Sequence, residues 1–181
     1  NNFQYLSHEF KGESQVLKIK DNNSIYKIQI NLIGKIQLKN ILMAIIAAKK
    51  SNIDIKKIFA VLPKIKPVEG RFERVGRIKN KSKVILDYAH TPDALKTCIT
   101  NLKEQFPDQK IFILFGCGGN RDQDKRAKMG KIADIYSDKI YLTDDNPRFE
   151  NPNKIRKDIK KGIKKQKIIE FSNRAKAISQ A

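Results

Sequence analysis

Three short polar segments could do chemistry, because each directly follows an apolar run that is typical of a buried strand. They are residues 87–92 (DYAHTP), 116–122 (GCGGNRD) and 143–148 (TDDNPR). In a parallel α/β sheet, ligands bind at the carboxyl ends of the strands. We therefore expect the three segments to meet at one edge of a sheet and to form one binding site.

Arg148 is the residue of these segments that is best suited to bind a carboxylate. It follows Pro147, whose ring restricts the backbone, and its planar guanidinium can hold both oxygens of a carboxylate. The alternative is a surface arginine that pairs with Asp144, Asp145 or Glu150. The sequence leaves both interpretations open.

The glycine-rich segment 116–122 reads GxGGxx rather than GxGxxG, and no acidic residue follows at the spacing expected for a ribose contact. A tight turn in which a β-carbon would clash explains the glycines at least as well. A dinucleotide-dependent oxidoreductase is therefore a minor alternative. The chain also has no GxxxxGK[ST] motif, since Gly34-Lys35 and Gly130-Lys131 are both followed by isoleucine. We expect the loop that binds a triphosphate to lie outside this chain.

The two histidines and two cysteines do not predict a zinc site. His8, His90, Cys98 and Cys117 lack the spacing of metal ligands, and the cysteines form no CxxC pair. His90 either acts as a base or hydrogen-bonds its neighbours at the start of a helix, as a lone histidine there more often does. Unpaired cysteines favour a reducing cytoplasm.

Behind the polar segments, apolar strands alternate with helices, which predicts a doubly wound, Rossmann-like α/β domain with a mostly parallel sheet. The expected helices begin at Thr91-Pro92-Asp93, near Arg126, at Asn151-Pro152, and at Ser172 or Asn173. The expected strands are Lys83–Leu86, 110–115, 139–142 and Ile168–Phe171.

The first third of the chain has a different pattern. Residues 13–33 alternate weakly around Asp21-Asn22-Asn23, which predicts a β-hairpin. Two helices follow, one with a wide apolar face over residues 41–48 and one over 53–62 that Pro63 stops. Two prolines frame residues 63–67, where periodicity is lost. We therefore expect one domain to end at residue 66 and a second to span 67–181.

A formal net charge of +19 raises the possibility of a nucleic-acid-binding module. The chain has few arginines among its 38 basic residues, and it contains no RNA-binding aromatic motif, zinc finger or helix-turn-helix pattern. Arginine is the usual reader of guanine edges and phosphates. A solvated, lysine-rich surface is the better interpretation, with attraction of anionic substrates as a further one. No apolar run reaches the ~18 residues that a membrane span needs.

Taken together, the motifs resemble the Mur ligase family, and within it the members that add meso-diaminopimelate. The pieces that carry the resemblance are GRFE (70–73), DYAHTPDAL (87–95), FGCGGNRD (115–122), Lys125-Arg126 through Gly130, and TDDNPR (143–148). Gly34 followed by Asn40-Ile41-Leu42 resembles the end of the family's central ATPase domain. The resemblance thus implies that residues 1–66 are the tail of that α/β domain, and that 67–181 are a C-terminal domain truncated at its end.

The resemblance implies an amide-bond ligase that joins meso-diaminopimelate to a UDP-N-acetylmuramoyl dipeptide. ATP converts a substrate carboxylate into an acyl phosphate, which the incoming amine attacks. Diaminopimelate ends in a second carboxylate that Arg148 can pair with, whereas lysine ends in an ammonium. The implied contacts are Asn40, Arg71, Asp87 and His90 for ATP, and Arg121, Asp145, Asn146 and Arg148 for the amino acid.

Departures from the family pattern limit these expectations. Gln37 stands where the family usually has asparagine. The phosphate-binding loop, a modified lysine and the magnesium ligands are expected upstream of this chain, and a Gly-Lys-Gly-His-Glu segment downstream of it. We therefore expect an inactive fragment of a cytoplasmic monomer that has neither nucleic-acid nor membrane partners. A lysine-adding relative, a folylpolyglutamate synthase-like ligase and a nucleic-acid-binding module remain the alternatives.

Overall fold

The computed structural model describes residues 3–78, 82–164 and 168–181. They form two compact units, Asn1–Tyr88 with Glu104–Pro107, and Ala89–Lys103 with Asp108–Ala181. Across these ranges, no helix is both long enough and apolar enough to cross a lipid bilayer.

In chain order the elements are β1 (Phe3–Lys11), β2 (Ser14–Asp21), β3 (Ser24–Ile30), α1 (Lys35–Lys50), α2 (Ile55–Val61), the 3-10 helix η1 (Leu62–Lys64), β4 (Glu73–Arg77), β5 (Lys83–Leu86), α3 (Pro92–Gln105), β6 (Phe112–Phe115), α4 (Asp124–Tyr136), β7 (Lys139–Thr143), α5 (Pro152–Lys160), β8 (Ile168–Phe171) and α6 (Arg174–Gln180).

The first unit contains the predicted hairpin as strands β2 and β3. Asp21 pairs with Ser24, so Asn22 and Asn23 form the turn, and Asn22 has a φ of 51°. Asparagine tolerates this left-handed conformation better than most residues. The strand β1, which pairs antiparallel with β2, is not evident from the sequence pattern.

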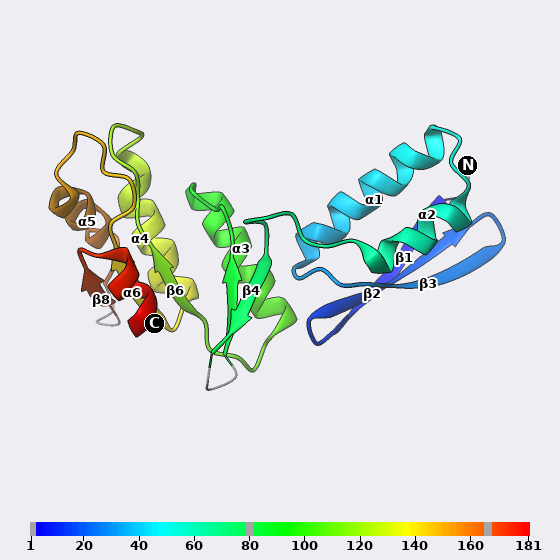
Figure 1. Ribbon diagram of the computed structural model, residues 1–181, viewed down its shortest axis with the longest axis horizontal. Coiled ribbons are helices and arrows are strands. Elements are labelled where there is room, and N and C mark those ends of the chain that lie inside the picture. Colours follow the sequence, from blue (N-terminus) through cyan, green and yellow to red (C-terminus); the bar gives the residue numbers. More distant parts are fainter. Residues whose placement is uncertain (1–2, 79–81, 165–167) are drawn as a thin grey trace. The chain divides into compact units, whose positions relative to one another are not determined.

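Helices α1 and α2 cover one face of the β1–β3 sheet, as Figure 1 shows. Asp54 begins α2 by accepting hydrogen bonds from the backbone N–H groups of Lys56 and Lys57, and the helix ends just before Pro63, as predicted. The buried side chains between sheet and helices come from both layers: Leu17, Ile19, Ile28 and Ile30 from the strands, and Leu38, Ile41, Ile45, Ile58 and Phe59 from the helices.

The strand Lys83–Leu86 lies where predicted but in a different sheet. It pairs antiparallel with β4, with Glu73 opposite Leu86, and these two strands form a sheet of their own. It alternates between half-buried and exposed residues, which suits an antiparallel ribbon with one wet face. The expectation that it joins the parallel sheet is wrong for the described residues.

The second unit contains a parallel sheet in the order β6-β7-β8. The central strand β7 is buried on both faces: Ile140 and Leu142 pack with α4 and α5, while Tyr141 alternates to the opposite face and α6 contacts β7 and β8. Helices on both faces of a parallel sheet are the arrangement of a doubly wound α/β domain. The predicted fold class is confirmed for this unit.

The helices of the second unit begin at the predicted capping residues. The Thr91 hydroxyl accepts a hydrogen bond from the Ala94 N–H, and the Asn151 side chain accepts one from Asn153. Asn173, one of the two predicted candidates, caps α6. Helix α4 begins at Asp124, two residues before the predicted start. Each of these capped helices follows a strand and a loop. Because the capping residue fixes where the helix begins, it also fixes where the preceding loop ends.

Candidate functional site

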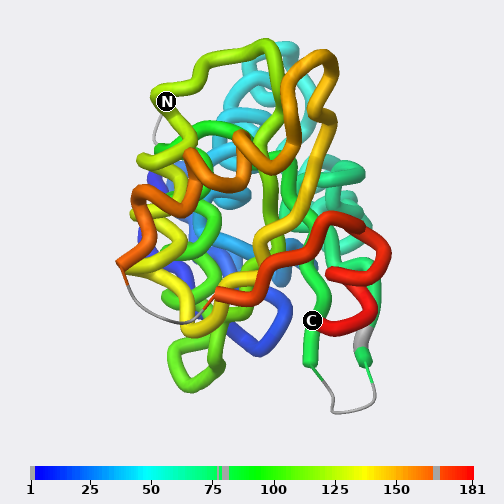
Figure 2. The backbone as a smooth tube through the Cα atoms, turned by 90° about the vertical axis from the view of Figure 1, so that its left-hand side faces the viewer, coloured from blue at the N-terminus to red at the C-terminus, as the bar shows by residue number. Residues whose placement is uncertain are grey.

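Residues 116–122, which follow β6, and residues 143–150, which begin with the last residue of β7, lie against each other at one end of the parallel sheet (Figure 2). A β-carbon on Gly116 would stand 2.2 Å from the Thr143 carbonyl oxygen, and one on Gly119 would stand 1.9 Å from that of Pro147. The Gly119 N–H donates to the Asn146 carbonyl at 2.8 Å. Gly116 and Gly119 are therefore explained by close backbone approach, and the structure brings two of the three predicted polar segments together.

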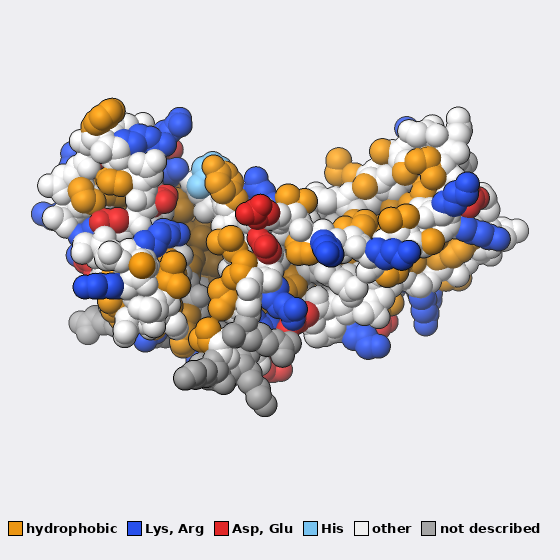
Figure 3. All heavy atoms as spheres, viewed as in Figure 1, with side chains coloured by type: hydrophobic (Ala, Val, Ile, Leu, Met, Phe, Trp, Pro, Cys, Tyr) orange, Lys and Arg blue, Asp and Glu red, His pale blue; other side chains and the backbone are white. Residues whose placement is uncertain are grey.

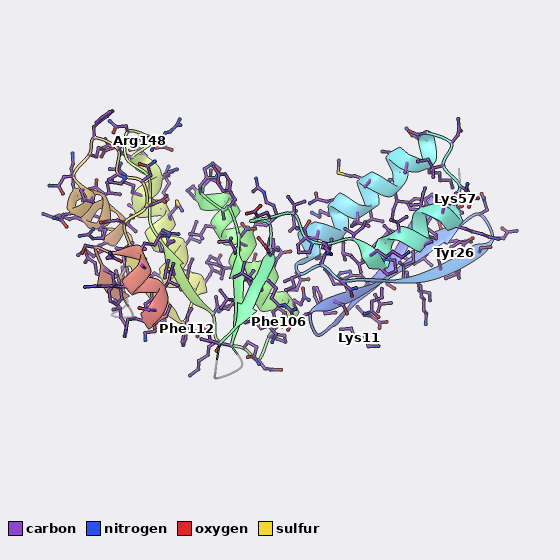
Figure 4. The ribbon with its side chains drawn as sticks, in the orientation of Figure 1. Lys11, Tyr26, Lys57, Phe106, Phe112 and Arg148 are labelled. Carbon is purple, nitrogen blue, oxygen red and sulfur yellow. The ribbon has the colours of Figure 1, made fainter. Side chains whose placement is uncertain are left out.

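Arg148 is folded onto the glycine-rich loop (Figure 4). Its Nη1 donates to the Gly119 carbonyl at 2.6 Å, and its backbone N–H donates to Asn146 Oδ1 at 3.3 Å. Its φ of 50° places the residue in the left-handed region. The Gly119 carbonyl thus orients the guanidinium of Arg148.

Glu150, an acidic neighbour of Arg148 in the sequence, forms an ion pair with a buried arginine. Arg126 of α4 is fully buried and holds both Glu150 carboxylate oxygens, at 2.8 and 2.9 Å. Asp158 lies 3.3 Å from the same guanidinium, and Glu150 also accepts the backbone N–H of Asn120. The hydrogen bonds from Arg126 and then from Asn120 lower the pKa of Glu150, which keeps this carboxylate charged.

Asp144, at the other end of the loop, also forms an ion pair with a buried arginine. Arg156 of α5 is buried and pairs with both Asp144 and Glu170. Among the described residues, Arg148 forms no ion pair. The alternative in which Arg148 is a surface arginine paired with its acidic neighbours is therefore not what the structure contains.

Arg126 and Arg156 were not predicted as site residues, although the sequence carries a signal for the first. Arg126, Met129 and Ala133 recur at helical spacing, which places an arginine on the apolar face of α4. A charged residue on such a face is almost never buried without a partner. That reasoning predicts a buried ion pair but does not identify Glu150 as the partner.

The remaining predicted residues of the second unit are exposed. Arg121 lies in the glycine-rich loop and Asp145 in the 143–150 loop, and both point to solvent. The backbone carbonyl of His90 accepts a hydrogen bond from Lys125 Nζ at 2.8 Å, which ties the start of α3 to the start of α4. Neither interpretation of the His90 ring is tested by this backbone contact.

In the first unit, Asn40, Arg71 and Asp87 belong to one hydrogen-bonded group. Gln37 links two of them: its side chain accepts from Asn40 Nδ2 at 3.1 Å and donates to the Arg71 carbonyl at 3.2 Å. Asp87 accepts the Phe72 N–H at 3.0 Å, and the Arg71 guanidinium lies 5.1 Å from the centre of the Tyr88 ring. Gln37, which departs from the family pattern, therefore connects the Asn40 side chain to the Arg71 backbone.

The described residues contain no group of three or more histidine, cysteine, aspartate or glutamate side chains that could hold a metal ion. Cys117, within the glycine-rich loop, is buried, and burial raises the pKa of its thiol to about 11. A thiol protonated at neutral pH is a poor nucleophile. Covalent chemistry at Cys117 is therefore not supported.

The positive charge is spread out on the face that Figure 3 shows. Lysine and arginine side chains occur singly or in small groups over each unit rather than as one continuous stripe. A nucleic-acid-binding surface usually concentrates them along one face or groove. On this face the distribution matches a solvated, lysine-rich surface.

A family model described as "Mur ligase, glutamate ligase domain" matches residues 70–181. The UDP-N-acetylmuramoyl-L-alanyl-D-glutamate--2,6-diaminopimelate ligase of Rickettsia felis is 38% identical over 190 aligned residues, which cover 98% of this chain and 35% of that protein. The ligase of the same name from Buchnera aphidicola is 44% identical over 149 residues, which cover 82% of this chain and 30% of that protein. The chain thus spans about a third of the length of these curated relatives.

Solved structures agree with these sequence relatives. A structure of a UDP-N-acetylmuramoyl-L-alanyl-D-glutamate--2,6-diaminopimelate ligase superposes with a TM-score of 0.71 at 29% identity, covering 99% of this chain and 37% of that one. A Mycobacterium tuberculosis folylpolyglutamate synthase shares the fold, with a TM-score of 0.78 at 19% identity over 99% of this chain and 40% of its own. The glycine-rich and TDDNPR loops, the fold that carries them and the match over residues 70–181 agree, and the chain belongs to the Mur ligase family.

Proposed function

We propose that this chain is part of an ATP-dependent ligase that adds meso-diaminopimelate to UDP-N-acetylmuramoyl-L-alanyl-D-glutamate in peptidoglycan synthesis. The observation that carries the proposal is Arg148, whose guanidinium is oriented by the Gly119 carbonyl and forms no ion pair within the described residues. A guanidinium that is held in place and forms no ion pair within the described residues is suited to bind the second carboxylate of diaminopimelate. The names of the relatives support the same substrate.

The reaction joins a carboxylate and an amine. The γ-phosphoryl group of ATP passes to a carboxylate oxygen of the dipeptide, giving an acyl phosphate and ADP. The amine of diaminopimelate attacks the acyl carbon and loses a proton to solvent, the amide bond forms and phosphate leaves with the bonding electron pair. Within this scheme the chain's own residues bind and orient the reactants.

We assign the incoming amino acid to Arg121, Asp145, Asn146 and Arg148, which all lie in the two loops of the second unit. Asn146 supports this assignment because its side chain and its carbonyl hold Arg148 and Gly119 in place. We assign ATP to Asn40, Arg71, Asp87 and His90. The Gln37-centred hydrogen bonds in the first unit support the grouping of Asn40 with Arg71.

Residues 1–66 are proposed to belong to the central ATP-binding domain of the ligase and residues 67–181 to its C-terminal domain. The described residues contain no group of three or more histidine, cysteine, aspartate or glutamate side chains that could hold a metal ion. We propose that the ligands of the magnesium that accompanies ATP lie outside this chain. We propose that the reaction takes place in the cytoplasm and that the protein is a monomer that acts without a nucleic-acid or membrane partner.

A comparison of two amino-acid substrates tests the proposal. The full-length protein is assayed for ADP release with the UDP-linked dipeptide and either meso-diaminopimelate or L-lysine. We expect turnover with diaminopimelate and little with lysine. Equal use of both amino acids would contradict the role of Arg148 and would favour the lysine-adding relative.

A further inference from the structure

Arg148 and Glu150 bind the same peptide group from opposite sides. The carbonyl of the Gly119–Asn120 peptide accepts from Arg148 Nη1 at 2.6 Å, and its N–H donates to Glu150 Oε1 at 2.5 Å. The C=O and N–H of a trans peptide point in opposite directions, so this arrangement separates the two side chains by only one peptide. From standard bond lengths, the guanidinium and the carboxylate are roughly 7 Å apart or less.

At this separation, the Glu150 carboxylate is the natural competitor for Arg148. The two residues lie two positions apart in one loop, both side chains turn toward the glycine-rich loop, and opposite charges at the protein surface attract over such distances. The structure nevertheless keeps them apart. An arginine paired with Glu150 would have fewer donors left for a ligand carboxylate.

Arg126 explains the separation. Its Nη1 and Nη2 each donate to one Glu150 oxygen, at 2.9 and 2.8 Å, in the two-point geometry that is strongest for arginine and carboxylate. The side chain of Arg126 is fully buried and that of Glu150 is 14% exposed. Because a buried guanidinium without its carboxylate is strongly unfavourable, Glu150 stays with Arg126 rather than turning to Arg148.

The same arrangement occurs at the beginning of the loop. Arg156 of α5 is buried and pairs with Asp144, and it also binds Glu170 at 2.7 Å. The side chain of Asn153 accepts a further hydrogen bond from Arg156. Two buried arginines from two helices thus hold Glu150 and Asp144, which lie on either side of Arg148 in the sequence.

We infer that Arg126 and Arg156 are positioning residues that engage Glu150 and Asp144 and so leave the Arg148 guanidinium available for the carboxylate of the incoming amino acid. The inference rests on the proposed function for the ligand itself. It adds that affinity for the amino acid depends on two arginines that do not touch it. Their effect is transmitted through the acidic residues that they hold.

A double-variant experiment separates this role from a merely structural one. In the full-length protein, Arg126→Met releases Glu150, and we expect the KM for meso-diaminopimelate to rise about tenfold or more while the KM for ATP changes less than about twofold, since a lost charged hydrogen bond typically costs this much. Adding Glu150→Gln removes the competing charge. The double variant should then recover most of the affinity for diaminopimelate.

Two further variants keep the test decisive if Arg126→Met does not fold. Arg126→Lys keeps a buried positive charge but cannot hold both carboxylate oxygens. We expect it to raise the same KM several-fold, and Arg126→Lys with Glu150→Gln to restore it. Arg156→Met alone and with Asp144→Asn repeats the comparison at the other end of the loop.

Lys49→Met is the matched control, because it removes a partly buried ion pair with Asp21 in the first unit. It should lower stability and leave the KM for diaminopimelate unchanged. Double variants that are no better than the single ones would overturn the inference, because the arginines would then act only through stability. If Arg148→Ala itself leaves that KM unchanged, the proposed function fails instead, so the two failures are distinguishable.

Discussion

The α-carbon of Gly119 lies so close to Pro147 that a β-carbon on it would stand 1.9 Å from the Pro147 carbonyl oxygen. The clash is with backbone, which cannot move aside without separating the two loops. The neighbouring Gly118 differs, since its β-carbon would stand 3.0 Å from the tip of the Arg148 side chain and 3.5 Å, an ordinary contact distance, from the Asn146 carbonyl oxygen. Adjacent glycines therefore have different roles in the same loop.

Gly119→Ala should destabilise the protein by about 3 kcal/mol, at the upper end of the usual cost of overpacking. Gly118→Ala should cost about 1 kcal/mol or less but displace the Arg148 guanidinium, and so raise the KM for diaminopimelate. Urea unfolding of both variants, together with kinetics of the full-length protein, checks the pair. Equal stability losses in the two variants would show that the Gly119 contact is relaxed in solution.

Arg148→Ala should reduce diaminopimelate use by about 10- to 100-fold, because hydrogen bonds to a charged group contribute about 1.5–3 kcal/mol. The KM for ATP should stay within about twofold. Arg148→Lys keeps the charge but loses the two-point geometry, so it should recover only part of the activity. Full activity of the lysine variant would mean that charge alone is recognised.

Gln37→Ala should raise the KM for ATP by about two- to tenfold, the equivalent of one neutral hydrogen bond or two weak ones. The reason is that Gln37 joins the Asn40 side chain to the Arg71 backbone. Gln29→Ala is the control, since Gln29 also makes side-chain hydrogen bonds in the first unit but to Ser14 and Asn31. An identical effect of both variants would contradict the proposed role of Gln37 in ATP binding.

Glu150→Gln should destabilise the protein at neutral pH and have a smaller effect in acid. Arg126 lowers the pKa of Glu150 below its usual 4.5 in the folded protein. Its contribution to stability is therefore complete above about pH 4.5 and is lost as the pH falls through the lowered value. The free energy of unfolding of the variant and the wild type, compared at pH 7 and in acid, checks the sign. A difference that is the same at both pH values would argue against a charged Glu150.

Much of the fold could be predicted because local signals and tertiary structure agree. The Asp21-Asn22-Asn23 turn, the Thr91 and Asn151 caps and the continuously apolar run that contains β6 each act within a few residues, and each occurs where predicted. The strand β1 was missed because its alternation is weak and most of it is exposed. The partner of Lys83–Leu86 was predicted wrongly because strand pairing depends on β4, whose short pattern resembles a loop.

The position of the candidate site could be predicted from the sequence, but the ion pairs among its charged side chains could not. Loops that follow strands of a parallel sheet must meet at the same edge, so the approach of the 116–122 and 143–148 segments follows from topology. The choice of Arg126 rather than Arg148 as the partner of Glu150 does not follow from topology, because three charges within one loop and one helix allow several pairings. Burial decides between them, and the sequence does not show which arginine is buried.

Under the proposed function, the left-handed backbone of Arg148 means that stability and substrate recognition make opposite demands on this position. Holding a side chain other than glycine at a φ of 50° costs about 1 kcal/mol or more. Asparagine or glycine would relieve that cost, so a laboratory selection for heat resistance alone would tend to discard the arginine. Thermostabilised variants of the full-length protein should accordingly be screened for turnover as well as for melting temperature, and position 148 should be held constant in any such library.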